Sequence, residues 1–120
     1  MYKQQDQSNS SVDNLYRPIP QDIIAVRLND YVHRYWKATL RTLTAERRQT
    51  AAHVLTEHFG FTVRQLSELF GCSRMTVYRD LRSVEFYCEH VSKFREESRR
   101  MEHFLRHYAQ YLGPWAQQLK

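Results

Sequence analysis

Three arginines and a tyrosine cluster in the segment GCSRMTVYRDLR, residues 71–82. If a helix starts after Ser73, the outer face of its first turns carries Arg74, Met75, Tyr78 and Arg79. A guanidinium group can donate two hydrogen bonds to one guanine, and a methionine can contact the methyl group of thymine. These four residues are therefore candidates for contacts with base edges, although an ordinary basic surface helix would show a similar pattern.

Candidate phosphate contacts lie beside this cluster. Helix N-termini, hydroxyl groups and arginines are frequent partners of DNA phosphates, and they position a protein without reading its sequence. The residues of suitable type and place are Thr62, Arg64, Ser73 and Arg82. Double-stranded DNA is thus the expected partner.

Residues 44–83 carry start and stop signals for three short helices. Thr44 can cap the first, and Gly60 is placed to end it. Thr62 and Gln65 have the spacing of a capping box for the second helix, and Ser73 can cap the third. None of these helices could bury its apolar face alone, so we expect them to pack as one trihelical unit.

The connection between the second and third helices has the pattern of a helix-turn-helix. Gly71 suits a turn with a positive φ, Ser67 supplies a small residue four positions earlier, and Val77 an apolar residue six positions later. Leu81 would face the core with Val77, opposite the arginines. This spacing predicts that the helix of residues 73–83 enters the major groove.

The stretch TVRQLSELFGCSRMTVYRDLRSVE resembles the helix-turn-helix of DeoR-type bacterial transcription regulators. The matching residues are Leu66, Leu69, Phe70, Gly71, Ser73, Met75, Thr76, Val77, Arg79, Asp80 and Leu81. The stretch is also similar to small sporulation-type DNA-binding regulators. The resemblance implies sequence-specific DNA binding, and it implies that Asp80 forms a structural ion pair with a neighbouring helix.

The resemblance fails in the segment that follows the helix-turn-helix. DeoR-type regulators continue with a glycine-bearing β wing, whereas residues 84–112 contain no glycine or proline and keep a helical pattern. These residues also offer no sugar-phosphate-sensing domain. A response to sugars is therefore not implied.

Two long helices are expected to flank the trihelical unit, after a polar arm of residues 1–20. Residues 21–43 form an amphipathic helix with an apolar stripe, and residues 84–120 a heptad-patterned helix with a tail. The second pattern predicts a dimerisation seam made of Val84, Tyr87, Val91, Phe94, Met101, Leu105, Tyr108 and Leu112. A homodimer is expected, but the same seam could fold back on residues 21–42 of its own chain. The predicted fold is all-α.

Composition narrows the possible functions of the chain. Eighteen basic and 13 acidic residues among 120 give a charge of +5, which suits a polyanionic partner. There is no apolar run of membrane-spanning length and no apolar stretch typical of a secretory signal, so a cytoplasmic protein without membrane contact is expected. Cys72 and Cys88 are expected to be free thiols.

No catalytic, metal or cofactor site is predicted. His103 and His107 are one helical turn apart, but no further ligands complete a site, so both are expected at the surface. The aromatic residues of YVHRYWKATLR, residues 31–41, have a spacing that suits a core or dimer surface better than stacking on single-stranded bases. An enzyme is not expected.

Three hypotheses follow. The first is a small transcription regulator that binds a specific DNA site as a homodimer. The second is an interaction protein or sigma-like adaptor whose helix-turn-helix binds RNA polymerase or another protein. The third is a nucleic-acid-binding protein without sequence preference.

Overall fold

The computed structural model describes residues 18–111, except for the side chains of residues 87–90. This part of the chain is helical and contains no strand, which confirms the predicted all-α fold. Its helices are α2 (Gln21–Trp36), α3 (Ala45–Phe59), α4 (Val63–Phe70), α5 (Arg74–His90) and α6 (Ser92–Arg106). The expected arm, up to residue 17, and the expected tail, from residue 112, lie outside the described residues. No helix within residues 18–111 is long and apolar enough to cross a membrane.

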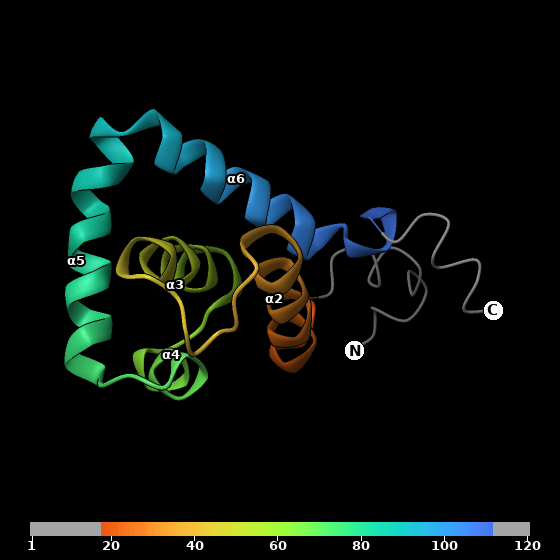
Figure 1. The fold of residues 1–120 in the computed structure, drawn as a ribbon, viewed down its shortest axis with the longest axis horizontal. Helices are drawn as coiled ribbons and strands as arrows, with labels where there is room; N and C mark the ends of the chain where they lie inside the picture. Colours follow the sequence, from red (N-terminus) through yellow and green to blue (C-terminus); the bar gives the residue numbers. More distant parts are fainter. Residues whose placement is uncertain (1–17, 112–120) are drawn as a thin grey trace, which may run out of the picture.

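The helices are arranged around α3. Figure 1 shows α5 along one side of α3, α6 crossing above it, α4 below it and α2 on the opposite side from α5. Thr44 caps α3 by accepting a hydrogen bond from the Arg47 N–H at 3.3 Å, and Gly60 ends it at φ 71°, as predicted. The central helix of the fold therefore starts and stops on local signals.

Helix α2 is shorter than the predicted helix of residues 21–43. It ends at Trp36 because Lys37 adopts the left-handed conformation, with φ 53°, and the Ala38 N–H bonds the Val32 carbonyl at 3.3 Å. A turn closed by Thr39 and Thr42 follows, in which the Thr42 N–H donates to the Thr39 carbonyl at 3.1 Å. Residues 37–44 therefore form a loop, which we call the α2–α3 loop.

The predicted single helix from Val84 to Leu112 is wrong, and so is the predicted end of the preceding helix at residue 83. Helix α5 continues to His90, where the chain turns at Val91 in an extended conformation with φ −125° and ψ 100°. Helix α6 then runs back across the molecule. This turn brings the apolar face of α6 onto α2 and α3 instead of extending it into solvent.

The predicted dimerisation seam is largely buried within one chain. Met101 and Leu105 are fully buried in the core together with Ile24 and Leu28 of α2, and Phe104 packs edge-on against Tyr31. Val84 and Phe94 are also buried, and Val91 and Tyr108 partly so. The side chain of Tyr87 and all of Leu112 lie outside the described residues. For Met101 and Leu105 the structure shows the fold-back alternative, because these side chains already have partners in their own chain.

Polar contacts strengthen the attachment of α6 and the residues after it to α2. The Tyr31 hydroxyl donates to Glu97, and burial together with this hydrogen bond raises the pKa of Tyr31. Arg27 donates to the Leu105 carbonyl at 2.6 Å, and the Tyr108 hydroxyl donates to Asp30 at 2.7 Å. The flanking helices thus form one layer joined by both apolar and polar contacts.

Replacement of Leu105 tests whether this contact lies within one chain. Leu105→Ala should lower the free energy of unfolding by about 2 to 5 kcal/mol because it leaves a cavity among α2, α3 and α6. The loss should be the same at low and high protein concentration in chemical denaturation. Val26→Ala, at an exposed position of α2, should change stability little. A loss for Leu105→Ala that changes with protein concentration, relative to the unmodified chain, would place Leu105 between chains instead.

Candidate nucleic-acid interface

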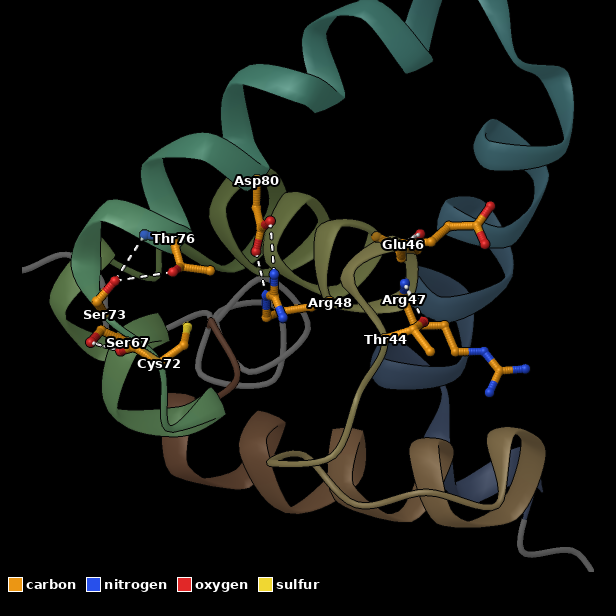
Figure 2. A network of polar contacts seen from close by, with 10 residues as sticks. Thr44, Glu46, Arg47, Arg48, Ser67, Cys72, Ser73, Thr76 and Asp80 are labelled. Atoms are coloured by element: carbon orange, nitrogen blue, oxygen red, sulfur yellow. Dashed lines mark hydrogen bonds and ion pairs between the residues drawn. The ribbon is translucent and has the colours of Figure 1, made fainter.

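The turn between α4 and α5 has the predicted helix-turn-helix geometry. Gly71 adopts φ 68°, and its N–H and that of Cys72 both donate to the Ser67 carbonyl, at 2.9 and 3.1 Å. The Ser67 hydroxyl closes the turn by donating to the Cys72 carbonyl at 2.5 Å (Figure 2). Ser67 therefore contributes both its carbonyl and its hydroxyl to the turn.

The two helices of the motif begin at the predicted caps. Thr62 accepts from the Gln65 N–H at 3.2 Å while Gln65 accepts from the Thr62 N–H at 2.8 Å, which completes the capping box. The Ser73 hydroxyl accepts from the Thr76 N–H at 3.1 Å (Figure 2). Both hydroxyls serve as caps, and both residues are exposed at a helix N-terminus, where the helix dipole attracts anions.

The inner face of α5 is fixed on α3 by an apolar residue and a buried charge. Val77 is fully buried. Asp80 accepts a forked pair of hydrogen bonds from Arg48, at 2.5 Å from Nε and 3.2 Å from Nη2 (Figure 2). The hydrogen bond to Asp80 raises the pKa of Arg48. The ion pair expected for Asp80 is thereby confirmed, and it joins the middle of α5 to α3.

The outer face of α5 is open to solvent. Met75 and Tyr78 are 66% and 53% exposed, and the predicted contact residues Arg74, Arg79 and Arg82 are exposed as well. None of these three arginines forms an ion pair or side-chain hydrogen bond with any residue that the structure describes. Their guanidinium groups are therefore available to an external acceptor.

Arg64 differs from the other predicted contact residues. It lies on the exposed side of α4 and forms an ion pair with Glu68 at 3.5 Å, in which both side chains are about 70% exposed. An exposed pair of this kind is weak, so it leaves Arg64 able to turn toward a phosphate. Arg64 and Thr62, the N-cap of α4, thus lie together at the N-terminal end of α4.

Two residues of this region have no local signal in the sequence. Arg48 is the partner of Asp80, but it lies 32 positions away on another helix. Arg41, in the α2–α3 loop, lies against Gly71: a Cβ atom built on Gly71 would be 2.5 Å from its Nη1 atom. Both contacts depend on how the helices pack.

The cysteines, the two neighbouring histidines and the aromatic residues of α2 were the minor candidates for chemistry. Cys72 is a free thiol packed against the core, and burial raises its pKa. The structure does not describe the side chain of Cys88. The rings of His103 and His107 lie 4.6 Å apart and are exposed, and no cluster of three metal-ligating side chains occurs in the described part of the chain. Tyr31 and Trp36 are buried, which confirms the core interpretation of these two aromatic residues.

Asp80→Asn tests the ion pair that holds α5. It keeps the shape of the side chain but leaves the Arg48 charge without its partner, so the free energy of unfolding should fall by about 3 kcal/mol. Glu68→Gln is the matched control, since it makes the same change in an exposed pair and should cost no more than about 1 kcal/mol. Urea denaturation of both variants measures the difference. Equal losses would show that the Arg48–Asp80 pair does not fix α5.

Comparison with known families agrees with this geometry. Residues 47–86 match the model of the DeoR-like helix-turn-helix domain, a span of 40 residues that contains α4 and most of α3 and α5. Comparisons with curated proteins and with solved structures found no significant match. Within residues 18–111 no β wing follows α5; α6 occupies this place in the chain. The chain therefore carries a DeoR-like helix-turn-helix domain, and at this level of description it is a DNA-binding transcription regulator.

Proposed function

We propose that the chain regulates transcription by binding a specific site in double-stranded DNA, with the N-terminal half of α5 in the major groove. In this proposal the base edges are contacted by Arg74, Met75, Tyr78 and Arg79. The observation that carries it is the contrast between the two faces of α5. The inner face is fixed by Val77 and Asp80, while the arginines of the outer face form no ion pair or side-chain hydrogen bond with any residue that the structure describes.

The unpaired arginines favour an external anionic partner. A structural arginine is usually joined to a carboxylate, as Arg48 is to Asp80, because a paired guanidinium stabilises the fold. Arg74 and Arg79 form no such pair with any residue of the described part of the chain, and they lie on a helix that Val77 and Asp80 attach to the core. A rigid helix with free guanidinium groups loses little conformational freedom when it binds, which suits base recognition.

Phosphate contacts are proposed at Thr62, Arg64, Ser73 and Arg82. Thr62 and Ser73 are exposed at the N-termini of α4 and α5, and the two arginines are exposed on the same two helices. Contacts of this kind would fix the orientation of α5 in the groove without selecting a sequence. The net charge of +5 would favour the initial association with DNA.

We also propose that two copies bind a symmetric site. One helix-turn-helix contacts few base pairs, and a two-fold arrangement doubles these contacts. Since Met101 and Leu105 are buried in their own chain, such a pair would form through surfaces outside the core. Symmetric half-sites in the selected DNA would support this arrangement, and single half-sites would contradict it.

Selection of bound duplexes from a random pool, followed by binding measurements, tests the function. With the selected site in hand, Arg79→Ala should weaken specific binding by about 1 to 3 kcal/mol and affect random DNA much less. The control is Arg99→Ala, which removes the same type of side chain from an exposed position of α6. It should leave both affinities almost unchanged.

Three results would contradict parts of the proposal. Equal losses on specific and random DNA would exclude Arg79 as a base contact. Equal competition by specific and random duplexes for the unmodified chain would favour a binder without sequence preference. An absence of duplex binding even at low salt would favour an adaptor that binds RNA polymerase or another protein.

A further inference from the structure

We infer that the α2–α3 loop is a second part of the DNA-binding surface, in which Arg41 contacts a phosphate beside the groove entered by α5. The inference rests on the proposed function and extends it, because Arg41 lies outside the matched residues 47–86. It would mean that the protein–DNA contact area includes a segment that precedes the helix-turn-helix domain.

The loop holds Arg41 in a defined place. Thr39 and Thr42 close the turn around it: the Thr39 N–H donates to the Thr42 hydroxyl oxygen at 3.0 Å, and the Thr42 N–H to the Thr39 carbonyl at 3.1 Å. On either side, Leu40 and Leu43 are partly buried and pack against the core. The backbone of Arg41 is thus fixed at both ends while its side chain remains exposed.

The side chain of Arg41 lies along the turn of the helix-turn-helix. A Cβ atom built on Gly71 would meet three of its atoms, at 2.5 Å from Nη1, 3.1 Å from Cζ and 3.3 Å from Cγ. Its Nη2 atom donates to the Glu68 carbonyl at 3.4 Å. Glycine at position 71 therefore leaves room for the guanidinium group of Arg41. Gly71 itself lies two residues before Ser73, the cap of α5.

No residue that the structure describes forms an ion pair with Arg41. The guanidinium group has five N–H donors, and its one described hydrogen bond is long and goes to a backbone carbonyl. It forms no ion pair with any residue in the described part of the chain; the nearby Glu68 carboxylate pairs with Arg64 instead. An exposed, pre-positioned arginine with free donors is well suited to a forked contact with a phosphate.

The position of Arg41 matches the expected course of the DNA backbone. When the N-terminal residues of a helix enter the major groove, the turn that precedes the helix lies near the edge of the groove, where the phosphates are. Figure 1 shows the α2–α3 loop reaching down toward α4, and the contacts of Arg41 with Gly71 and Glu68 place its side chain at the C-terminal end of α4. Arg41 would thus meet a phosphate flanking the bases contacted by Arg74.

If Arg41 only stabilised α4, its replacement would have a different effect on stability and on the salt dependence of DNA binding than if it contacted a phosphate. Arginines near a helix C-terminus can stabilise it by bonding its last carbonyls, and Glu68 is in the last turn of α4. Such a role would affect stability and leave the salt dependence of DNA binding unchanged. A phosphate contact releases counterions on binding, so its loss reduces the slope of log K against log salt by about 0.9.

The test compares Arg41→Gln with Lys37→Gln in the full chain, on the selected duplex and on a random duplex, across a range of salt concentrations. Lys37 is an equally charged, exposed residue of the same loop that donates to a backbone carbonyl, that of Arg34, at 3.1 Å. Arg41→Gln should reduce the salt slope by about 1 and weaken both duplexes by similar factors. Lys37→Gln should leave the slope unchanged, and Arg41→Lys should restore most of it.

The possible outcomes separate this inference from the function on which it rests. An unchanged slope for Arg41→Gln, with normal binding by the unmodified chain, would overturn the inference and leave the proposed function intact. A lower melting temperature with an unchanged slope would also overturn it and assign Arg41 to α4 alone. If the unmodified chain bound no duplex, the proposed function itself would fail.

Discussion

The position of the proposed DNA-binding face depends on the ion pair between Arg48 of α3 and Asp80 of α5. Both hydrogen bonds of this forked pair are made in a largely buried place, where the attraction between the charges is screened less than in water. Together with Val77, the pair fixes the rotation of α5 about its own axis. Because of this fixed rotation, Arg74, Met75, Tyr78 and Arg79 face solvent together.

The rest of the fold keeps α3 in position to hold α5. Helix α6 packs on α3 from one side, and its Met101 and Leu105 share a core with α2. The hydrogen bonds of Tyr31 with Glu97 and of Tyr108 with Asp30 join the two flanking helices across a long sequence separation. The contacts among α2, α3 and α6 stabilise the fold. The outer face of α5 takes little part in these contacts, so its side chains can serve binding instead.

The features that could be predicted from the sequence depend on residues close together along the chain. The caps at Thr44, Thr62 and Ser73 and the turn at Gly71 could be predicted because each involves contacts within a few positions of the chain. The break at Val91 could not, since no glycine or proline marks it and the same heptad pattern suits a seam between chains or within one. The place of Arg41 beside Gly71 was also hidden, because it results from the packing of the α2–α3 loop on α4. The exposed face of α5 was predicted, but only the structure shows that its arginines form no ion pair with any of the described residues.

The turn at Val91 makes the folding of the matched domain, residues 47–86, depend on helices outside it. Because α6 returns over α3, residues of the matched domain such as Ala51 and Leu55 share their burial with side chains from outside it, among them Met101 and Leu28. An excised segment of residues 47–86 would expose these apolar surfaces to water. A chimeric regulator would therefore have to include α2 and α6 together with the matched domain. The segment that can be transferred to another protein is α2 to α6, and not the helix-turn-helix alone.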